Sequence, residues 1–242
     1  MRLELRPREA HVWYLFPAAF PAALEGQAQA LMSDDERQRH GRFHFAAGRR
    51  EYLLTRTLVR TTLSRYADVE PGEWRFSAGK YGRPQLDPAL GLALHFNLSN
   101  TEGLIACIVA AEPEIGIDVE WVDPSPPGTD LAERFFSPVE IAGLRDLPPQ
   151  LQAGRFYDLW TLKEAYIKAR GMGVVLPLDQ FSFDLSTPTV TLSFDPRMID
   201  LPETWHFDRL FPSASHRVAI AVRRAAGSSV EVLERTASPF ER

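Results

Sequence analysis

Hydrophobic residues follow two different spacings along this chain. From Gly48 to Tyr66, apolar residues recur at helical intervals with arginines among them, which predicts an amphipathic helix with a basic face. The same kind of pattern at about residues 154–170, ended by Gly171, predicts a second long helix. Short apolar runs predict strands at residues 11–16, 74–76, 92–98, 104–110, 115–122, 181–185, 190–194, 205–210 and 218–222.

The order of these predicted elements occurs twice. Each half of the chain runs from a strand through helices to further strands, and Ser33 and Ser137 are placed to cap helices. We therefore predict an α+β fold made of two similar halves, at residues 1–111 and 112–225. Residues 226–242 hold glycine, serine and proline and are predicted to form a peripheral tail.

The composition limits the class of protein. The chain has 242 residues, of which 45% are hydrophobic and 24% charged, so it can bury a core in one large domain or two smaller ones. The formal net charge of -5 argues against a nucleic-acid-binding protein that relies on general charge attraction. An anionic ligand would therefore have to be held by a local group of residues.

The single cysteine and the apolar segments indicate the compartment. Cys107 lies in an apolar run, so we predict a buried strand thiol and no intrachain disulfide, as in a reducing cytoplasm. No segment approaches the roughly 18 consecutive apolar residues of a membrane span. The apolar residues 12–16 are preceded by glutamates and followed by prolines, unlike a signal peptide. We expect a cytoplasmic protein that binds neither membranes nor nucleic acid.

Two carboxylates share one face of a predicted strand. Asp118 and Glu120 are two residues apart, and side chains alternate across a strand. Like charges side by side repel unless a cation or donors lie between them, so a metal ion would explain the pair, although plain solvated faces also carry such pairs. On the later helix, Trp160, Glu164 and Lys168 form one stripe with a spacing of four. The alternative is a surface Glu164–Lys168 ion pair worth about 0.3 to 0.5 kcal/mol, but the indole indicates a partly buried face.

The ligand chemistry favours magnesium over zinc. Carboxylate oxygens are hard ligands, and no histidine or cysteine cluster accompanies them. His40 and His44 are four apart, but without an acidic ligand motif we interpret them as surface or core residues. Because Mg²⁺ shares its coordination sphere with substrate phosphates, a phosphorylated substrate is expected.

Five short motifs follow one another along the chain. They are GRP at residues 82–84, FNLSNT at 96–101, GIDVE at 116–120, RFFS at 134–137 and WTLKEAYIK at 160–168. In combination they resemble the 4'-phosphopantetheinyl transferases of the two-domain Sfp type, over most of the chain. The resemblance implies two pseudo-twofold-related α+β halves, each with a mainly antiparallel sheet packed against helices, and an active site in the cleft between them that binds coenzyme A.

The resemblance also implies roles for individual residues. The metal ligands would be Asp118, Glu120 and Glu164, and Lys168 would lie near the pyrophosphate of the coenzyme. The residues implied to contact the coenzyme are Arg83, Pro84, Asn97, Ser99, Asn100, Thr101, Asp118 and Lys168, with Arg49 and Arg50 assigned to its 3'-phosphate. Most relatives carry histidine in place of Asn100, serine in place of Thr101, and often lysine in place of Arg83. An asparagine can donate a hydrogen bond but cannot be cationic.

The reaction implied is the transfer of 4'-phosphopantetheine from coenzyme A to a serine hydroxyl of an acyl or peptidyl carrier protein. It requires Mg²⁺, with Mn²⁺ as an alternative, and releases adenosine 3',5'-bisphosphate. Glu164 would accept the serine proton directly or through a metal-bound water, Lys168 would stabilise the phosphoryl oxygens, and Asp118 would hold the metal.

The expected partner is an acidic carrier protein of fatty acid, polyketide or nonribosomal peptide biosynthesis. It would dock against residues 134–136 and the following helix, although one of Phe135 and Phe136 is expected in the core. Family analogy suggests a monomer. Two other readings remain open on sequence alone: a Mg²⁺-dependent pyrophosphate or phosphodiester hydrolase, and a non-catalytic coenzyme A or carrier-binding module.

Overall fold

The computed structural model describes residues 2–79, 82–123, 129–173 and 176–240. Most of the proline-rich loop expected at residues 123–128 and part of the loop at residues 79–84 lie outside this range. The chain divides into two compact units, one of residues 1–111 with 231–242 and the other of residues 112–230. None of the helices in the described ranges combines the length and apolarity needed to span a membrane.

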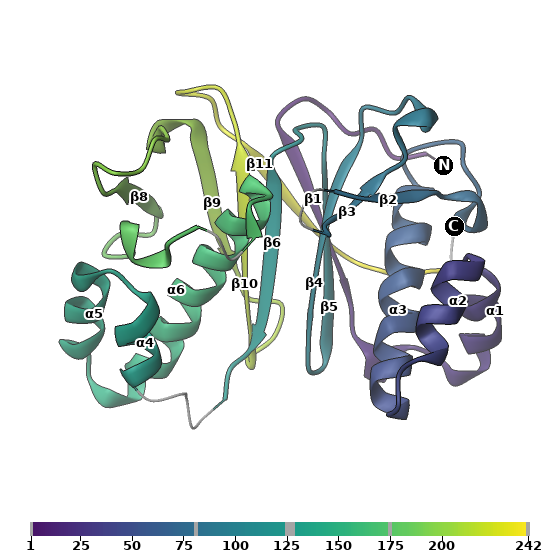
Figure 1. Cartoon of the computed structure of the whole chain (residues 1–242), viewed down its shortest axis with the longest axis horizontal. Helices are drawn as coiled ribbons and strands as arrows, with labels where there is room; N and C mark the ends of the chain where they lie inside the picture. The colour runs from purple at the N-terminus through teal and green to yellow at the C-terminus, as the bar shows by residue number, and fades with distance from the viewer. Residues whose placement is uncertain (1, 80–81, 124–128, 174–175, 241–242) are drawn as a thin grey trace. The chain divides into compact units, whose positions relative to one another are not determined.

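The first unit is built on a four-stranded sheet. In sheet order its strands are β11 (Glu231–Thr236), β1 (Glu9–Leu15), β5 (Leu104–Ala110) and β4 (His95–Thr101). β1, β5 and β4 pair antiparallel, whereas β11 runs parallel to β1. Figure 1 shows the helices α1 (Glu25–Ala30), α2 (Asp34–Gly41) and α3 (Ala46–Leu63) on one side of this sheet. A small sheet of β2 (Phe76–Ala78) and β3 (Pro84–Leu86) completes the unit.

Helix α3 places its apolar stripe against the sheet, but part of its basic face is buried as well. Leu54 and Leu58 are fully buried in the core of the first unit, as the apolar spacing predicts. Arg60 is only 1% exposed, and its guanidinium binds the carboxylate of Glu36 at 2.7 Å. Arg56 binds the same carboxylate at 2.9 Å. The arginines of this helix therefore range from half-buried to buried.

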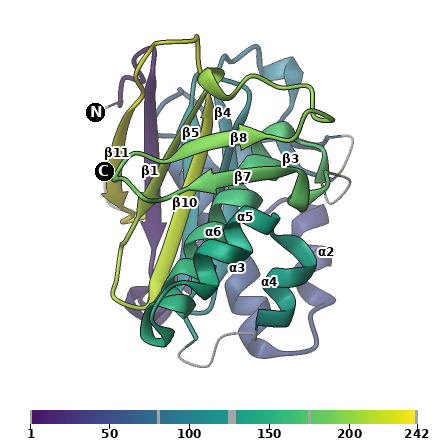
Figure 2. The ribbon, with the colours of Figure 1, turned by 90° about the vertical axis from the view of Figure 1, so that its left-hand side faces the viewer.

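The second unit has a three-stranded antiparallel sheet covered by helices. The sheet order is β6 (Ile115–Trp121), β10 (His216–Arg223) and β9 (Trp205–Leu210). The helices are α4 (Thr129–Phe135), α5 (Pro138–Arg145) and α6 (Pro149–Arg170), of which α6 lies along β6 and β10 (Figure 1). Figure 2 shows the hairpin of β7 (Phe181–Asp184) and β8 (Thr191–Phe194) beside α5.

The predicted α+β class with mainly antiparallel sheets is confirmed, and so is the buried thiol of Cys107. The prediction of a peripheral tail at residues 226–242 is wrong, because Glu231–Thr236 forms β11 and pairs with β1 along its length. The pairing satisfies backbone groups at an edge of β1 that the sequence alone left without a partner strand. The second long helix also begins earlier than expected, at Pro149, where a proline is tolerated in the first turn.

Candidate active site

A glycine lets helix α6 lie directly on strand β6. A Cβ atom at Gly116 would lie 2.0 Å from the carbonyl oxygen of Ala165 and 2.6 Å from the backbone nitrogen of Ala169. Both alanines are buried, at 0% and 2% exposure. Small residues on both elements therefore allow a close contact between backbones, which brings the neighbouring side chains of strand and helix within reach of one another.

The face of β6 that meets α6 carries the paired acids. Asp118 and Glu120 share a face with Gly116, and Ile117 and Val119 point to the other face. Asp118 is 5% exposed. Across the sheet its neighbour on β10 is the small, buried Ala219.

The helical stripe predicted from the sequence faces these acids. The ammonium of Lys168 donates to Asp118 Oδ1 at 2.6 Å and to the carbonyl oxygen of Ile117 at 3.1 Å. The indole of Trp160 donates a hydrogen bond to Glu120. Trp160, Glu164 and Lys168 thus do not form an isolated surface pair, because two of the three bind groups on β6.

The pKa values show that the three acids are electrostatically coupled. Burial, followed by the charge of Asp118, raises the pKa of Glu120 to about 7, and Glu164 contributes to the same effect. Burial and then the charge of Asp118 raise the pKa of Glu164 as well. The helix acid therefore lies near the strand pair, and the group concentrates negative charge that a cation would relieve.

The carboxylate ligands suit a hard divalent cation, but the three acids do not form a compact cluster. Within the described ranges, no three His, Cys, Asp or Glu side chains form a ready cluster for a metal ion. The position of Lys168 gives a physical reason, since its ammonium already neutralises Asp118 at the centre of the group. Three carboxylates that repel one another and contain no soft ligand still match Mg²⁺ or Mn²⁺ better than zinc.

The segment of β4 that was expected to contact the coenzyme divides between two faces of its sheet. Asn97, Ser99 and Thr101 lie on one face, and Asn97 and Ser99 are buried. Asn100 lies on the opposite face, where its amide donates to the carboxylate of Glu51 in helix α3. These residues therefore cannot all contact the coenzyme from the same side of the strand.

The basic residues expected at the coenzyme also differ in their surroundings. Arg83 follows the undescribed residues 80–81, donates to the carbonyl oxygen of Phe96 at 3.2 Å, and has its pKa lowered by burial. Arg50 binds Glu25 at 2.7 Å and donates to two backbone carbonyls, which indicates a structural role. Arg49 is less constrained, since its guanidinium donates to the carbonyl oxygen of Phe43 in an exposed position.

A network centred on Lys163 received no role in the sequence analysis. Lys163 is fully buried, and its ammonium lies 2.8 Å from the carboxylate of Glu140. The same ammonium donates to the carbonyl oxygens of Leu178 at 2.8 Å and Phe181 at 2.7 Å. Glu140 in turn caps helix α5 through Ser137. The sequence signal that could have indicated this buried lysine is the set of apolar residues around Lys163, which lies one residue before Glu164.

Of the two aromatic residues expected at a docking surface, one belongs to the core. Phe136 is 2% exposed and packs on Phe156. Phe135 is partly buried and contacts the ring of Trp160 edge-on at 5.7 Å. The expectation of one core residue is met, and the other supports the indole that binds Glu120.

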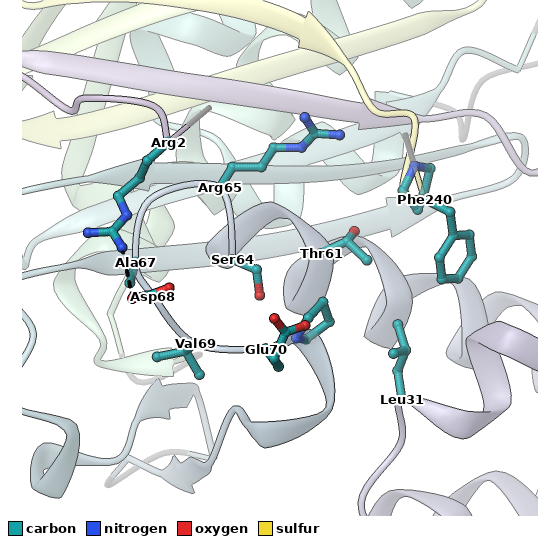
Figure 3. Close-up of a pocket in the computed structure, with 12 residues that line it drawn as sticks. Arg2, Leu31, Thr61, Ser64, Arg65, Ala67, Asp68, Val69, Glu70 and Phe240 are labelled. Carbon is teal, nitrogen blue, oxygen red and sulfur yellow. Dashed lines mark ion pairs between the residues drawn. The ribbon is translucent and has the colours of Figure 1, made fainter. Parts of the chain in front are cut away.

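A cavity of about 550 Å³ in the first unit, shown in Figure 3, is lined by none of these residues. Several of its charged and polar groups are already engaged: Arg2 pairs with Asp68 at 3.4 Å, Arg65 donates to the carbonyl oxygen of Ser238, and Ser64 accepts from an indole. It contains none of the chemistry expected of the active site. The candidate site therefore remains the contact between β6 and α6.

The fold and this site together define a class of protein. An α+β unit in which a strand and a helix bring three carboxylates and an ammonium together is suited to a metal-assisted reaction of a phosphorylated substrate. Comparison with known proteins narrows the class. The sequence model described as "4'-phosphopantetheinyl transferase superfamily" matches residues 114–221, which include β6 and α6.

Relatives extend this match over nearly the whole chain. The protein is 35% identical over 221 residues to the 4'-phosphopantetheinyl transferase HetI of Nostoc sp., covering 91% of this chain and 90% of that one. It is 36% identical over 156 residues to the 4'-phosphopantetheinyl transferase Sfp of Bacillus subtilis, covering 64% and 67% of the two chains. The crystal structure of Thermotoga maritima holo-[acyl-carrier-protein] synthase aligns with 46% of this chain and 62% of its own, at 21% identity and a TM-score of 0.37. The chain belongs to the 4'-phosphopantetheinyl transferase superfamily, which confirms the family predicted from its motifs.

Proposed function

We propose that this protein transfers 4'-phosphopantetheine from coenzyme A to a serine hydroxyl of an acyl or peptidyl carrier protein, releasing adenosine 3',5'-bisphosphate. One observation carries the proposal together with the family membership: Asp118 and Glu120 of β6 meet Glu164 and Lys168 of α6 at a close backbone contact. Carboxylates and an ammonium held this closely suit phosphoryl chemistry, where charge must be neutralised and a proton removed.

Each group has a role that its surroundings support. Asp118, Glu120 and Glu164 would hold Mg²⁺ or Mn²⁺, which when bound neutralises charge on the pyrophosphate and the leaving group. Glu164, whose pKa is raised by burial in the metal-free site, is the carboxylate assigned to accept the serine proton. Lys168 supplies a positive charge for the phosphoryl oxygens.

Contacts to coenzyme A from the first unit are assigned to residues that retain suitable groups. Arg49 is the better candidate of the two arginines for the 3'-phosphate, because Arg50 is held by Glu25. Arg83, with Pro84 beside it, provides a guanidinium for a phosphate. On β4 the candidates divide by face, with Asn97, Ser99 and Thr101 on one side and Asn100 on the other.

The carrier protein would bind at the second unit near α4 and α5. Arg134 is exposed, as is the apolar side chain of Val139 at 74%. A basic and an apolar side chain together match an acidic carrier that presents apolar residues beside its modified serine. We propose that the protein acts as a monomer in the cytoplasm.

The direct test is incubation with an apo carrier, coenzyme A and Mg²⁺, followed by mass spectrometry of the carrier. The expected result is the gain of one phosphopantetheine arm. Adenosine bisphosphate released without any carrier would indicate a hydrolase instead. If the protein binds coenzyme A but no carrier in a panel gains mass, transfer is refuted and a non-catalytic binding module is indicated.

Variants of the acids separate chemistry from folding. Asp118→Ala and Glu164→Ala should abolish transfer while the circular dichroism spectrum is retained. Asp195→Ala removes an equally charged side chain from an exposed turn, where the carboxylate pairs with Arg197, and should leave transfer unchanged. Loss of the folded spectrum in the first two variants would favour a structural role for the site.

A further inference from the structure

The contact between Lys168 and Asp118 has consequences for cation binding. The ammonium of Lys168 lies 2.6 Å from Asp118 Oδ1, and the carboxylate side chain is only 7% exposed. A second bond, to the carbonyl oxygen of Ile117 at 3.1 Å, fixes the ammonium against β6. A charge-assisted bond in such a sheltered position is stronger than a surface ion pair.

The ammonium of Lys168 offsets the negative charge of the surrounding acids, as a bound metal ion would. Glu120 and Glu164 both sense the charge of Asp118, and the charge of Lys168 acts on each of them in the opposite direction. One positive charge thus offsets part of a group of three carboxylates. A divalent cation held by these acids would approach the same carboxylate and would also be repelled by the ammonium.

We propose that Lys168 and the divalent cation compete for Asp118, so that cation binding displaces the lysine from this carboxylate. The inference rests on the proposed function, since it takes these acids as the cation site. Lysine suits an exchange of this kind because its ammonium is a compact charge on a flexible stem. Its side chain is 28% exposed, which leaves the ammonium a path away from Asp118.

The competition predicts that removing the ammonium strengthens cation binding even though it removes a catalytic group. Hydrogen bonds to charged groups are strong enough to change an equilibrium about 10- to 100-fold. The variant Lys168→Met should therefore bind Mg²⁺ about tenfold or more tightly than the wild type, in the absence of coenzyme A and of any carrier. Lys168→Arg keeps a competing charge and should bind Mg²⁺ much as the wild type does.

Isothermal titration of the full chain with MgCl₂ measures these affinities, with MnCl₂ as a second probe. Arg197→Met is the matched control, because it removes one positive charge from an exposed turn of the same unit. A double-mutant cycle with Asp118→Asn isolates the pair: in that background, Lys168→Met should bring a clearly smaller gain in Mg²⁺ affinity, since only the repulsion by the ammonium is then removed. Lys168→Gln replaces Lys168→Met if the latter does not give a folded circular dichroism spectrum.

Equal or weaker Mg²⁺ binding by Lys168→Met would overturn the inference, and so would an equal gain in Arg197→Met, which would indicate a general charge effect. Absence of binding in every variant would overturn it together with the cation site. The transfer assay of the wild type is read separately. If the wild type transfers phosphopantetheine but Lys168→Met binds Mg²⁺ no more tightly, the inference alone is refuted. If Lys168→Met binds Mg²⁺ more tightly but the wild type shows no transfer, the proposed function alone is refuted.

Discussion

Replacing Gly116 by alanine tests whether the close contact between β6 and α6 builds the site. The added Cβ would lie 2.0 Å from the carbonyl oxygen of Ala165 and 2.6 Å from the nitrogen of Ala169, whereas ordinary van der Waals contact begins at 3.4 Å. Both opposing atoms are backbone, so no side-chain rotation relieves the overlap. The helix and the strand must therefore separate locally by about 1 Å or more.

Two losses follow from this separation. Overpacking of a buried contact typically lowers the free energy of unfolding by 1–3 kcal/mol, and occasionally by more. Because rigid backbone lies on both sides of Gly116, we expect a loss of about 3 kcal/mol. A displacement of about 1 Å between Glu164 or Lys168 and the acids of β6 should lower kcat about 100-fold. We expect both effects in the same variant, because one contact supports both the core of the second unit and the site.

Urea unfolding followed by circular dichroism measures the first loss, and mass-spectrometric transfer kinetics measure the second. The control is Gly26→Ala in helix α1 of the first unit, where an added Cβ meets no atom within 4 Å. This control should keep its activity and gain up to about 1 kcal/mol, because alanine favours the helix. A Gly116→Ala variant with the stability and kcat of the wild type would show that the contact does not position the acids.

Three further predictions concern charge and chain ends. Because the folded pKa of Glu120 is raised to about 7, the folded state binds the proton more tightly, and stability should fall as pH rises from about 4.5 to 7 in EDTA. Glu120→Gln should remove this fall, and its free energy of unfolding at pH 8 should exceed that of the wild type by about 1–2 kcal/mol, allowing for partial solvent screening. Parallel pH profiles of urea unfolding for the variant and the wild type would contradict the raised pKa of Glu120. Lys163→Met leaves the carboxylate of Glu140 buried without its ammonium partner, so the free energy of unfolding measured in urea should fall by about 3–5 kcal/mol. The double variant with Glu140→Gln should recover part of that loss. Truncation after Val230 removes β11 and should lower the melting temperature, but truncation after Ala237, which keeps the strand, should lower it less; equal effects would show that β11 adds little.

The family could be predicted from short stretches of sequence, and so could the faces on which the candidate site residues lie. The alternation that puts Asp118 and Glu120 on one face, and the spacing of four that aligns Glu164 with Lys168, are properties of a single strand and a single helix. Strand limits such as Leu104–Ala110 follow from the same local patterns. The local geometry of the backbone sets these periods, so they can be read without knowing what each element packs against.

Other features depended on residues that are far apart in the chain. Strand β11 joins β1 across more than two hundred residues, and no local pattern near residue 231 names its partner. The basic face of α3 illustrates the same limit, since the buried Arg60 is paired with Glu36 of another helix and donates to the backbone carbonyls of Pro71 and Trp74. Likewise, Asn100 was grouped with its neighbours in sequence, but its amide binds Glu51 on the other side of the strand from Asn97.

The sequence by itself determined which residues are candidates for the chemistry and which of them share a face of a strand or helix, because shared faces depend on repeats of two to four residues. Tertiary structure decided how those faces meet, that Lys168 rather than solvent neutralises Asp118, and which arginines are available to a ligand. These outcomes depend on distances of a few ångströms between elements, and such distances are set by packing of the whole unit, as at the single missing Cβ of Gly116.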